Sequence, residues 1–404
     1  MQTLDRRAAW ERFRGPALAC TALLLLGYAR LAPGTRFENP RAYRVWSFGA
    51  YAYSDVIALH EDRGGGRHKA PYFHDRIEYP VLLGIHVWWP SVLAPNRTGY
   101  FALSYAALAL CALLSLWLLC GLAGTQPWAF AATPALTLYA GLNWDLFAIL
   151  PMMLGISLWA AGRATPGVLA LAAGACTKLF PVLALPPLLA REPPQRAAFL
   201  AAVALAFAVA VNAPFAFFAQ KEWLWFFEYN AGRDNEPSLY TMFGAGRRAF
   251  IPEASWILAA AVMALTGVFV LLRRRLEPRS AIAAMLLVFL FFTRVWSPQY
   301  WLWVFAALAL CGAPPWVAAV ASGEAVFDYV VQFGYLHLQF EGAWTQAAWL
   351  FRELFVPQLA IRYAVLGACA GLALARSFRG GSTPAVAGGA VACRADVSSL
   401  DLPS

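Results

Sequence analysis

The sequence predicts an all-α membrane protein whose helices cross the bilayer about twelve times. Of its 404 residues, 61% are hydrophobic and only 13% are charged, whereas soluble domains contain about 25% charged residues. Long apolar runs recur along the chain, and a membrane-spanning helix needs about 20 apolar residues. The runs are continuous and do not alternate with polar residues, so they indicate helices and not the strands of a membrane barrel.

The net charge of +9 lies mainly in short clusters between the apolar runs. This distribution is typical of cytoplasmic loops in membrane proteins. No compact basic patch with interleaved aromatic residues is present, so nucleic-acid binding is not expected. None of the seven Cys forms a C-x-x-C pair, so neither a disulfide framework nor a zinc site is indicated.

The first span is expected at 16–33, after a basic N-terminal segment, 1–15, that we place in the cytoplasm. A cleaved signal peptide is the alternative, but the length of the run and the spans that follow favour a retained signal anchor. Residues 34–97 are then the first outer loop. Within this loop, 80–95 is expected to be a short helix that is half-inserted in the membrane or lies at its surface.

A helix break is expected between 166 and 190, because Pro181 removes a backbone donor from an apolar run. Arg163 before this run and Arg191 after it both favour the cytoplasm, so we expect two half-spans with Lys178 at the outward apex. Broken helices at membrane depth are tolerated where they line a cavity. The other spans are expected at 98–120, 127–141, 144–161, 197–218, 254–272, 280–294, 299–312, 315–335 and 356–375.

Two more polar segments, 219–253 and 336–355, are expected to be outer loops, whereas the three Arg at 273–275 mark an inner loop. The transmembrane domain would cover 16–376. The Gly-, Ser- and Ala-rich residues 377–404 are expected to form a disordered cytoplasmic tail.

The first outer loop is unusually polar for so apolar a chain, because carboxylates, basic groups and three His crowd into 51–80. Asp55 stands directly before the apolar run 56–59, and Asp75 and Glu78 belong to a second polar cluster. We therefore interpret this loop as half of an active site, with Asp55 as its reacting carboxylate.

Six short motifs occur at the outward ends of the expected helices. They are Tyr53-Ser54-Asp55, Glu78-Tyr79-Pro80, Asn143-Trp144-Asp145, Thr177-Lys178-Leu179-Phe180-Pro181, Ser238-Leu239 and Ser297-Pro298-Gln299-Tyr300. In this order they resemble the glycosyltransferase 87 family, within the GT-C superfold of membrane glycosyltransferases, over about residues 40–360. The resemblance implies a GT-C-like bundle with a catalytic first outer loop, and a polyprenyl-phosphate sugar, commonly a mannose, as donor. Asp55 matches the catalytic carboxylate of the family.

Glycosyl transfer from a lipid phosphate requires a base that takes the proton of the acceptor hydroxyl. Burial among Tyr51, Tyr53 and the apolar run would raise the pKa of Asp55 towards a useful range. We expect Asp55 to act as this base in a single-step, inverting displacement. An ordinary loop carboxylate paired with Arg41 or Arg44 is the alternative. Asp75 and Glu78 are expected to orient acceptor hydroxyls or to pair with Arg76.

The phosphate of the donor requires cations. Lys178 lies beside a helix break in an apolar setting, where an ionisable residue is a functional candidate. It would bind phosphate, or pair with Asp145 or Asp328. Arg294 closes an apolar run, so it would bind phosphate or extend to the membrane surface. Arg233, in the second outer loop, is a further phosphate candidate.

His337 stands at an outer helix end, and we expect it to contact phosphate or handle a proton unless it is a plain interfacial His. Asn143 and Asp145 would position substrate or cap a helix. Gln299 is added to the substrate-binding residues from its motif. The three His of the first outer loop have the spacing of no standard metal site, and Ser54 stands where many members of the superfold carry a second acidic residue, so no metal or cofactor is expected.

Together with the resemblance, these residues predict a glycosyltransferase of the bacterial plasma membrane. It would move a hexose, with mannose expected from the family, from a polyprenyl phosphate to a lipid or glycan hydroxyl on the extracytoplasmic side. A secondary transporter or lipid flippase is the alternative, because broken helices and intramembrane charges also mark transporters. Transporters usually contain two related halves, and none are evident here. A non-catalytic membrane assembly factor is a third interpretation, which would not require the polar loops to converge.

Overall fold

The computed structural model describes residues 1–62, 70–74, 76–94, 96–233, 237–243 and 252–379, and for 61–62, 243 and 252–254 it describes the backbone alone. The expected cytoplasmic tail lies outside these residues beyond Arg379, and so does Asp75. In the described part the chain is mainly helical, and an isolated β-bridge pairs Thr3 with Leu122.

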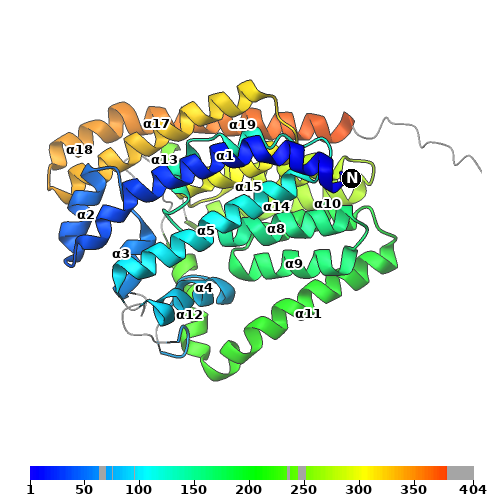
Figure 1. The fold of residues 1–404 in the computed structure, drawn as a ribbon, viewed down its shortest axis with the longest axis horizontal. Coiled ribbons are helices and arrows are strands. Elements are labelled where there is room, and N and C mark those ends of the chain that lie inside the picture. Colours follow the sequence, from blue (N-terminus) through cyan, green and yellow to red (C-terminus); the bar gives the residue numbers. More distant parts are fainter. Residues whose placement is uncertain (63–69, 75, 95, 234–236, 244–251, 380–404) are drawn as a thin grey trace, which may run out of the picture.

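The helices lie roughly along one common direction (Figure 1). The α-helices are α1 (Arg6–Leu31), α2 (Pro40–Gly49), α3 (Asp55–Asp62), α4 (Val81–Leu93), α5 (Arg97–Cys120), α6 (Trp128–Ala131), α7 (Ala135–Tyr139), α8 (Leu146–Ala160), α9 (Ala164–Thr177), α10 (Leu185–Leu189), α11 (Pro194–Phe218), α12 (Gln220–Gly232), α13 (Leu239–Phe243), α14 (Pro252–Leu272), α15 (Pro278–Phe292), α16 (Trp301–Leu310), α17 (Pro315–Phe340), α18 (Trp344–Leu350) and α19 (Val356–Arg379). Three short 3₁₀ turns, η1 (Ala32–Arg36), η3 (Phe180–Ala184) and η4 (Pro298–Tyr300), and the π-helical turn η5 (Phe351–Phe355) complete the elements. The expectation of an all-α chain is confirmed.

Among the described residues, five helical segments are long and apolar enough to cross a membrane, so the chain is a multi-pass membrane protein by length and composition. They are Arg6–Arg36, Arg97–Cys120, Pro194–Phe218, Ser255–Leu272 and Trp344–Arg379. Six shorter apolar helices accompany them. The expected total of about twelve spans stays a prediction.

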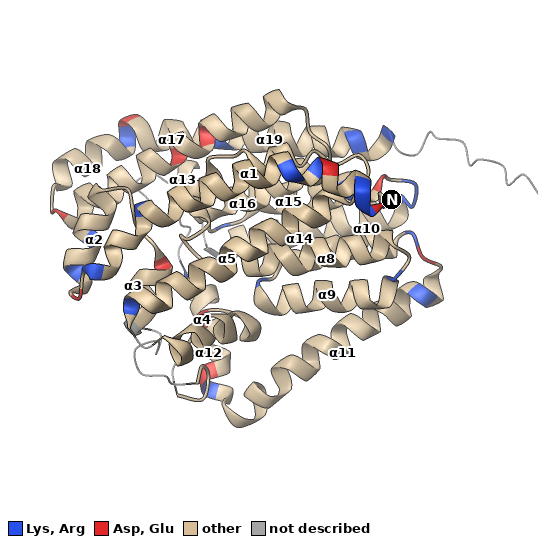
Figure 2. Cartoon of the chain, in the orientation of Figure 1, with Lys and Arg blue, Asp and Glu red and all other residues tan. Residues whose placement is uncertain are grey.

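Charged residues are sparse along the middle of the bundle and gather towards its two ends (Figure 2). At one end, near the N-terminus, Arg12 binds the carbonyls of Cys120, Leu122 and Thr125. Helices α2, α3 and α18 lie at the opposite end (Figure 1). This distribution matches a bundle whose middle lies in hydrocarbon, where unpaired charges are costly.

Two expected elements are wrong. The span expected at 127–141 is two short helices, α6 and α7, because Pro134 cannot continue the helix of the preceding turn. The outer loop expected at 336–355 is mostly helical, since α17 continues to Phe340 and α18 follows. The break expected at 178–181 is present: α9 ends at Thr177, Lys178 is extended, and η3 begins at Phe180.

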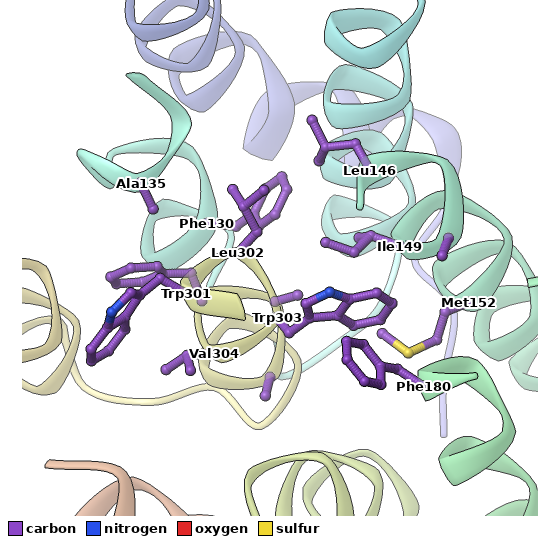
Figure 3. Close-up of a cluster of buried hydrophobic side chains, with 14 of the residues drawn as sticks. Phe130, Ala135, Leu146, Ile149, Met152, Phe180, Trp301, Leu302, Trp303 and Val304 are labelled. Carbon is purple, nitrogen blue, oxygen red and sulfur yellow. The ribbon is translucent and has the colours of Figure 1, made fainter. Parts of the chain in front are cut away.

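The core surrounds α16, every residue of which is buried. Trp303 of this helix packs edge-on against Phe180, with ring centroids 4.6 Å apart. Figure 3 shows Trp303 between Ile149 and Phe180, and Trp301 on the other side of the same helix. This packing fixes η3, and with it the chain just after Lys178, against the centre of the bundle.

Candidate active site

A cavity of about 790 Å³ opens among α3, η3, α12, α14 and α17 and the segments before α4, before α8, after α9 and after α15. These elements are far apart in the sequence. Seven of the ten predicted site residues line the cavity, namely Asp55, Glu78, Asn143, Lys178, Arg233, Arg294 and Gln299. The structure therefore brings together most of the polar residues that the sequence singled out.

The backbone before Asp55 is fixed by the loop between α7 and α8. The Asp55 N–H donates to the Leu142 carbonyl over 2.7 Å, and the hydroxyl of fully buried Ser54 donates to the Gly141 carbonyl over 2.5 Å. The Tyr43 hydroxyl accepts from the Ser54 N–H at 2.9 Å and donates to the Ser54 carbonyl at 3.1 Å. These bonds hold Asp55 at the start of α3 in one position.

Tyr51 adopts an unusual backbone conformation, with φ at 51°. Residues other than glycine rarely occupy this left-handed region, and when they do they often lie at functional sites. The Tyr51 carbonyl accepts hydrogen bonds from the Tyr329 hydroxyl at 2.7 Å and from the Arg30 guanidinium. Arg30 also donates to the carbonyls of Thr137 and Leu138, so α1, α7 and α17 together clamp the turn that leads to Asp55.

Asp55 is half-buried and accepts a hydrogen bond from Asn143 Nδ2 at 2.8 Å. Burial raises the pKa of Asp55, while hydrogen bonds from Asn143 and Tyr53 and the nearby charge of Lys178 hold this rise in check. Its partners among the described residues are thus not Arg41 or Arg44. The carboxylate has the features of a general base, since it is partly desolvated and faces a cavity.

Lys178 belongs to the cavity wall and to the core at the same time. Its Nζ lies 2.6 Å from Asp145 Oδ2 and 3.0 Å from Asn143 Oδ1. Asp145 is fully buried, and its other oxygen accepts from Trp303 Nε1 at 2.7 Å. The pairing of Lys178 with Asp145, which the sequence left as an alternative to phosphate binding, is therefore present, and Lys178 still faces the cavity.

Two arginines line other parts of the cavity wall. Arg294 follows α15, is buried, and lies over the Trp256 ring with its guanidinium carbon 5.2 Å from the ring centroid. Arg233 caps the end of α12 and lies 5.7 Å from the centroid of the Tyr229 ring. With Lys178, the cavity holds three cations that an anionic ligand could contact.

One wall of the cavity is apolar and belongs to a helix that is exposed at the molecular surface. Ala259, Ala260 and Met263 of α14 line the cavity, whereas Ile257 and Leu265 of the same helix are 69% and 70% exposed. Since α14 is apolar enough to span a membrane, its exposed face suits contact with lipid. On this side, α14 lies between the cavity and that exposed apolar face.

Two predicted site residues, Asp145 and His337, are not brought to the cavity. Asp145 lies behind Lys178 in the core, and its side chain caps no helix end. His337 lies at the end of α17 against Gly49 of α2, with Nε2 3.6 Å from Glu341 Oε1. It is absent from the cavity wall because Leu336, which does line the wall, projects about 100° away from its neighbour on a helix. Asp75 lies outside the described residues.

Several other polar residues of the cavity could not be selected from the sequence. Tyr229 and Asn230 of α12 and Gln332 of α17 line it, but neutral polar residues on aromatic or apolar helices carry no distinctive pattern. Arg30 had a usable signal, since it is the only basic residue in the apolar stretch 16–33. A charge there is costly unless it has a partner or a function.

Chemically, the cavity combines a candidate base, a second carboxylate in Glu78, three cations and an apolar wall. This set suits a ligand with a hydroxyl, a phosphate and a long apolar chain. Among the described residues, no group of three His, Cys, Asp or Glu side chains is placed to hold a metal ion.

Comparisons with known proteins assign no family to the chain. No protein-family model and no curated protein matches it. Among solved structures, it is similar to the crystal structure of ArnT from Cupriavidus metallidurans bound to undecaprenyl phosphate, with 16% sequence identity and a TM-score of 0.44 over 89% of this chain and 76% of that chain. This similarity is too low to assign an activity, and membership of the glycosyltransferase 87 family stays a prediction.

Proposed function

We propose that this protein is a membrane glycosyltransferase that moves a sugar from a polyprenyl-phosphate donor to a hydroxyl of a lipid or glycan acceptor. The observation that carries the proposal is the cavity in which Asp55 shares one space with Lys178, Arg233 and Arg294. Such a cavity supplies a base for the acceptor and positive charge for the leaving phosphate. The six motifs that resemble the glycosyltransferase 87 family provide independent support, and mannose is the donor sugar that they favour.

In the proposed reaction, Asp55 takes the proton of the acceptor hydroxyl while the hydroxyl oxygen attacks the anomeric carbon. The bond from that carbon to the donor phosphate oxygen breaks, and the lipid phosphate leaves with the electron pair. Attack and departure on opposite faces invert the anomeric configuration. Lys178, Arg233 and Arg294 stabilise the charge that develops on the phosphate, and the α14 wall receives the prenyl chain.

The proposal places the site on the extracytoplasmic side of a bacterial plasma membrane. Helix α3, which begins with Asp55, lies at the end of the bundle away from the N-terminus (Figure 1). The N-terminal segment is basic, and basic segments favour the cytoplasm.

Asp55→Asn tests this function against Glu38→Gln, which neutralises an exposed carboxylate of the same outer loop. Purified variants would be placed in vesicles made from lipids of the source membrane, with polyprenyl phosphate mannose labelled in the sugar. We expect the parent protein and Glu38→Gln to form a new labelled product of inverted configuration, and Asp55→Asn to lose about 10²-fold or more in rate. Movement of the labelled donor across the vesicle membrane with no new product would overturn the proposal in favour of a flippase. Full activity of Asp55→Asn would remove Asp55 as the base.

A further inference from the structure

A continuous polar chain leads from the core to Asp55, and its two innermost members, Trp303 and Asp145, do not line the cavity. Trp303 Nε1 donates to Asp145 Oδ1 at 2.7 Å, Asp145 Oδ2 lies 2.6 Å from Lys178 Nζ, Lys178 donates to Asn143 Oδ1 at 3.0 Å, and Asn143 Nδ2 donates to Asp55 Oδ2 at 2.8 Å. Asp145 and Trp303 are fully buried. The innermost carboxylate therefore acts on the cavity only through its neighbours.

The donors and acceptors in this chain fix the direction of the Asn143 amide. An ammonium group only donates hydrogen bonds, so Lys178 must face the amide oxygen. The Trp144 N–H donates to the same oxygen at 2.7 Å. The amide NH₂ group is thereby turned to Asp55 and to the Tyr79 hydroxyl, which lies 3.3 Å away.

Asp145 also balances the charge of Lys178. Lys178 is only 11% exposed at its side chain, and a cation so placed would act strongly on a nearby carboxylate in this poorly solvated setting. With Asp145 ionised beside it, Lys178 can hold Asn143 without its full charge acting on Asp55.

We propose that Asp145 is a positioning residue for the reaction: it neutralises Lys178 and, through Lys178, holds the Asn143 amide in the orientation that presents its N–H to Asp55. This inference rests on the proposed function of Asp55 as a base. It differs from the expectation that Asp145 contacts substrate, because Asp145 does not line the cavity.

Other ionisable groups face Asp55, and all of them except Lys178 stay unchanged in the test. They are Glu78 before α4, Tyr53 before α3, Tyr43 of α2 and Lys178 after α9, with Arg233 and Arg294 elsewhere in the cavity wall. Of these ionisable groups, only Lys178 contacts Asp145. A change at Asp145 therefore reaches Asp55 through Lys178.

The test compares the pH dependence of kcat in Asp145→Asn, Lys178→Met and the double variant. In Asp145→Asn, the unbalanced charge of Lys178 favours the charged form of Asp55. The acid limb of the plot of kcat against pH, where activity falls as the base is protonated, therefore moves to lower pH by about one unit. In Lys178→Met, the remaining Asp145 charge disfavours that carboxylate, so the limb moves to higher pH. The double variant removes both charges and returns the limb towards that of the parent protein.

Glu324→Gln is the matched control, because Glu324 is a buried carboxylate that pairs with Gln358 and lies outside the cavity wall. It should leave the limb in place even if it destabilises the protein. If Asp145 has a purely structural role, its replacement lowers activity, but the acid limb does not move in opposite directions in Asp145→Asn and Lys178→Met. That result would overturn the inference. If Asp145→Asn does not fold, the test compares Lys178→Met with the double variant. The inference then requires the acid limb of the double variant to lie at lower pH than that of Lys178→Met.

An infrared titration of the Asp55 carboxyl group, identified by subtracting the spectrum of Asp55→Asn, gives the same comparison without any donor. Opposite shifts of this titration in a protein that transfers no sugar would support the charge coupling and overturn the proposed function. If the parent protein transfers sugar but the Asp55 carboxyl group titrates equally in all variants, the proposed function stands and the inference about Asp145 is overturned.

Discussion

Asn143 and Asp55, 88 positions apart in the sequence, are joined by a hydrogen bond of 2.8 Å from the Asn143 amide to the Asp55 carboxylate. Asn143 lies in the loop before α8, and the adjoining Leu142 carbonyl accepts from the Asp55 N–H. The carboxylate that we propose as the base is thus held twice by one loop. Its position depends on the packing of α8 as much as on its own outer loop.

Replacing Asn143 by Ala should move the acid limb of the kcat profile to higher pH, by about one unit. The Asn143 N–H stabilises the charged form of Asp55, so its loss adds to the upward pKa shift that burial already causes. The measurement is the pH dependence of sugar transfer under saturating donor. Asn96→Ala, which removes the N-cap of α5 outside the cavity wall, is the control and should not displace the limb.

The apolar wall of the cavity predicts a dependence on the length of the donor lipid. Ala259→Trp adds a large side chain to the wall formed by α14, and we expect it to raise the KM for a long-chain polyprenyl donor about tenfold or more. The KM for a short, water-soluble analogue should change far less. Ile257→Trp, on the exposed face of the same helix, is the matched control. An equal loss for both donors would show that the prenyl chain does not follow α14.

A buried ion pair next to the site predicts a large effect on stability. Asp328 of α17 and Arg362 of α19 form a salt bridge in which neither side chain is exposed, and Trp296 and Trp301 also donate to Asp328. Arg362→Met leaves an uncompensated buried carboxylate and should destabilise the fold by about 3–5 kcal/mol. Thermal unfolding in detergent would show a lower midpoint.

The double variant Asp328→Leu with Arg362→Met is the control for this pair, and it should recover much of the lost stability, since it leaves no unpaired charge. The surface pair of Glu11 and Arg14 offers a second comparison, because both side chains are more than half exposed. Breaking it should leave the midpoint almost unchanged. Equal effects at the two pairs would contradict the structural role of Asp328 and Arg362.

Helices that combine a long apolar run with a clear boundary could be predicted from the sequence. The span expected at 98–120 is Arg97–Cys120 and that expected at 197–218 is Pro194–Phe218. The prediction of one span at 127–141 is wrong. It relied on the apolar composition of this stretch and not on Pro134, which stops the helix. Most of these residues are still apolar and buried, so composition predicted their environment but not their conformation.

The site was predictable where a charged residue stands out against apolar neighbours. Asp55, Lys178 and Arg294 were selected for that reason, and all three line the cavity. Partnerships across long separations have no local signal, so the sequence could not choose between Asp145 and Asp328 as the partner of Lys178. His337 was selected because it stands at a helix end, but its direction on α17 takes it to Gly49 of α2.

Hydrogen bonds from Arg30 and Tyr329 hold the Tyr51 carbonyl. We therefore predict that the backbone conformation of Tyr51 controls the turn before Asp55. The φ of 51° is tolerated best by Gly and Asn, whereas a β-branched side chain adopts it at a clear cost. Tyr51→Asn and Tyr51→Val both remove the aromatic ring, so the difference between them reports the backbone alone. We expect the Val variant to be less stable than the Asn variant by about 1–3 kcal/mol, and to lose more sugar transfer because the carbonyl bonds to Tyr329 and Arg30 are disturbed. Thermal unfolding and kcat measured on the same preparations would check this, and equal values for the two variants would show that the turn can relax without moving Asp55.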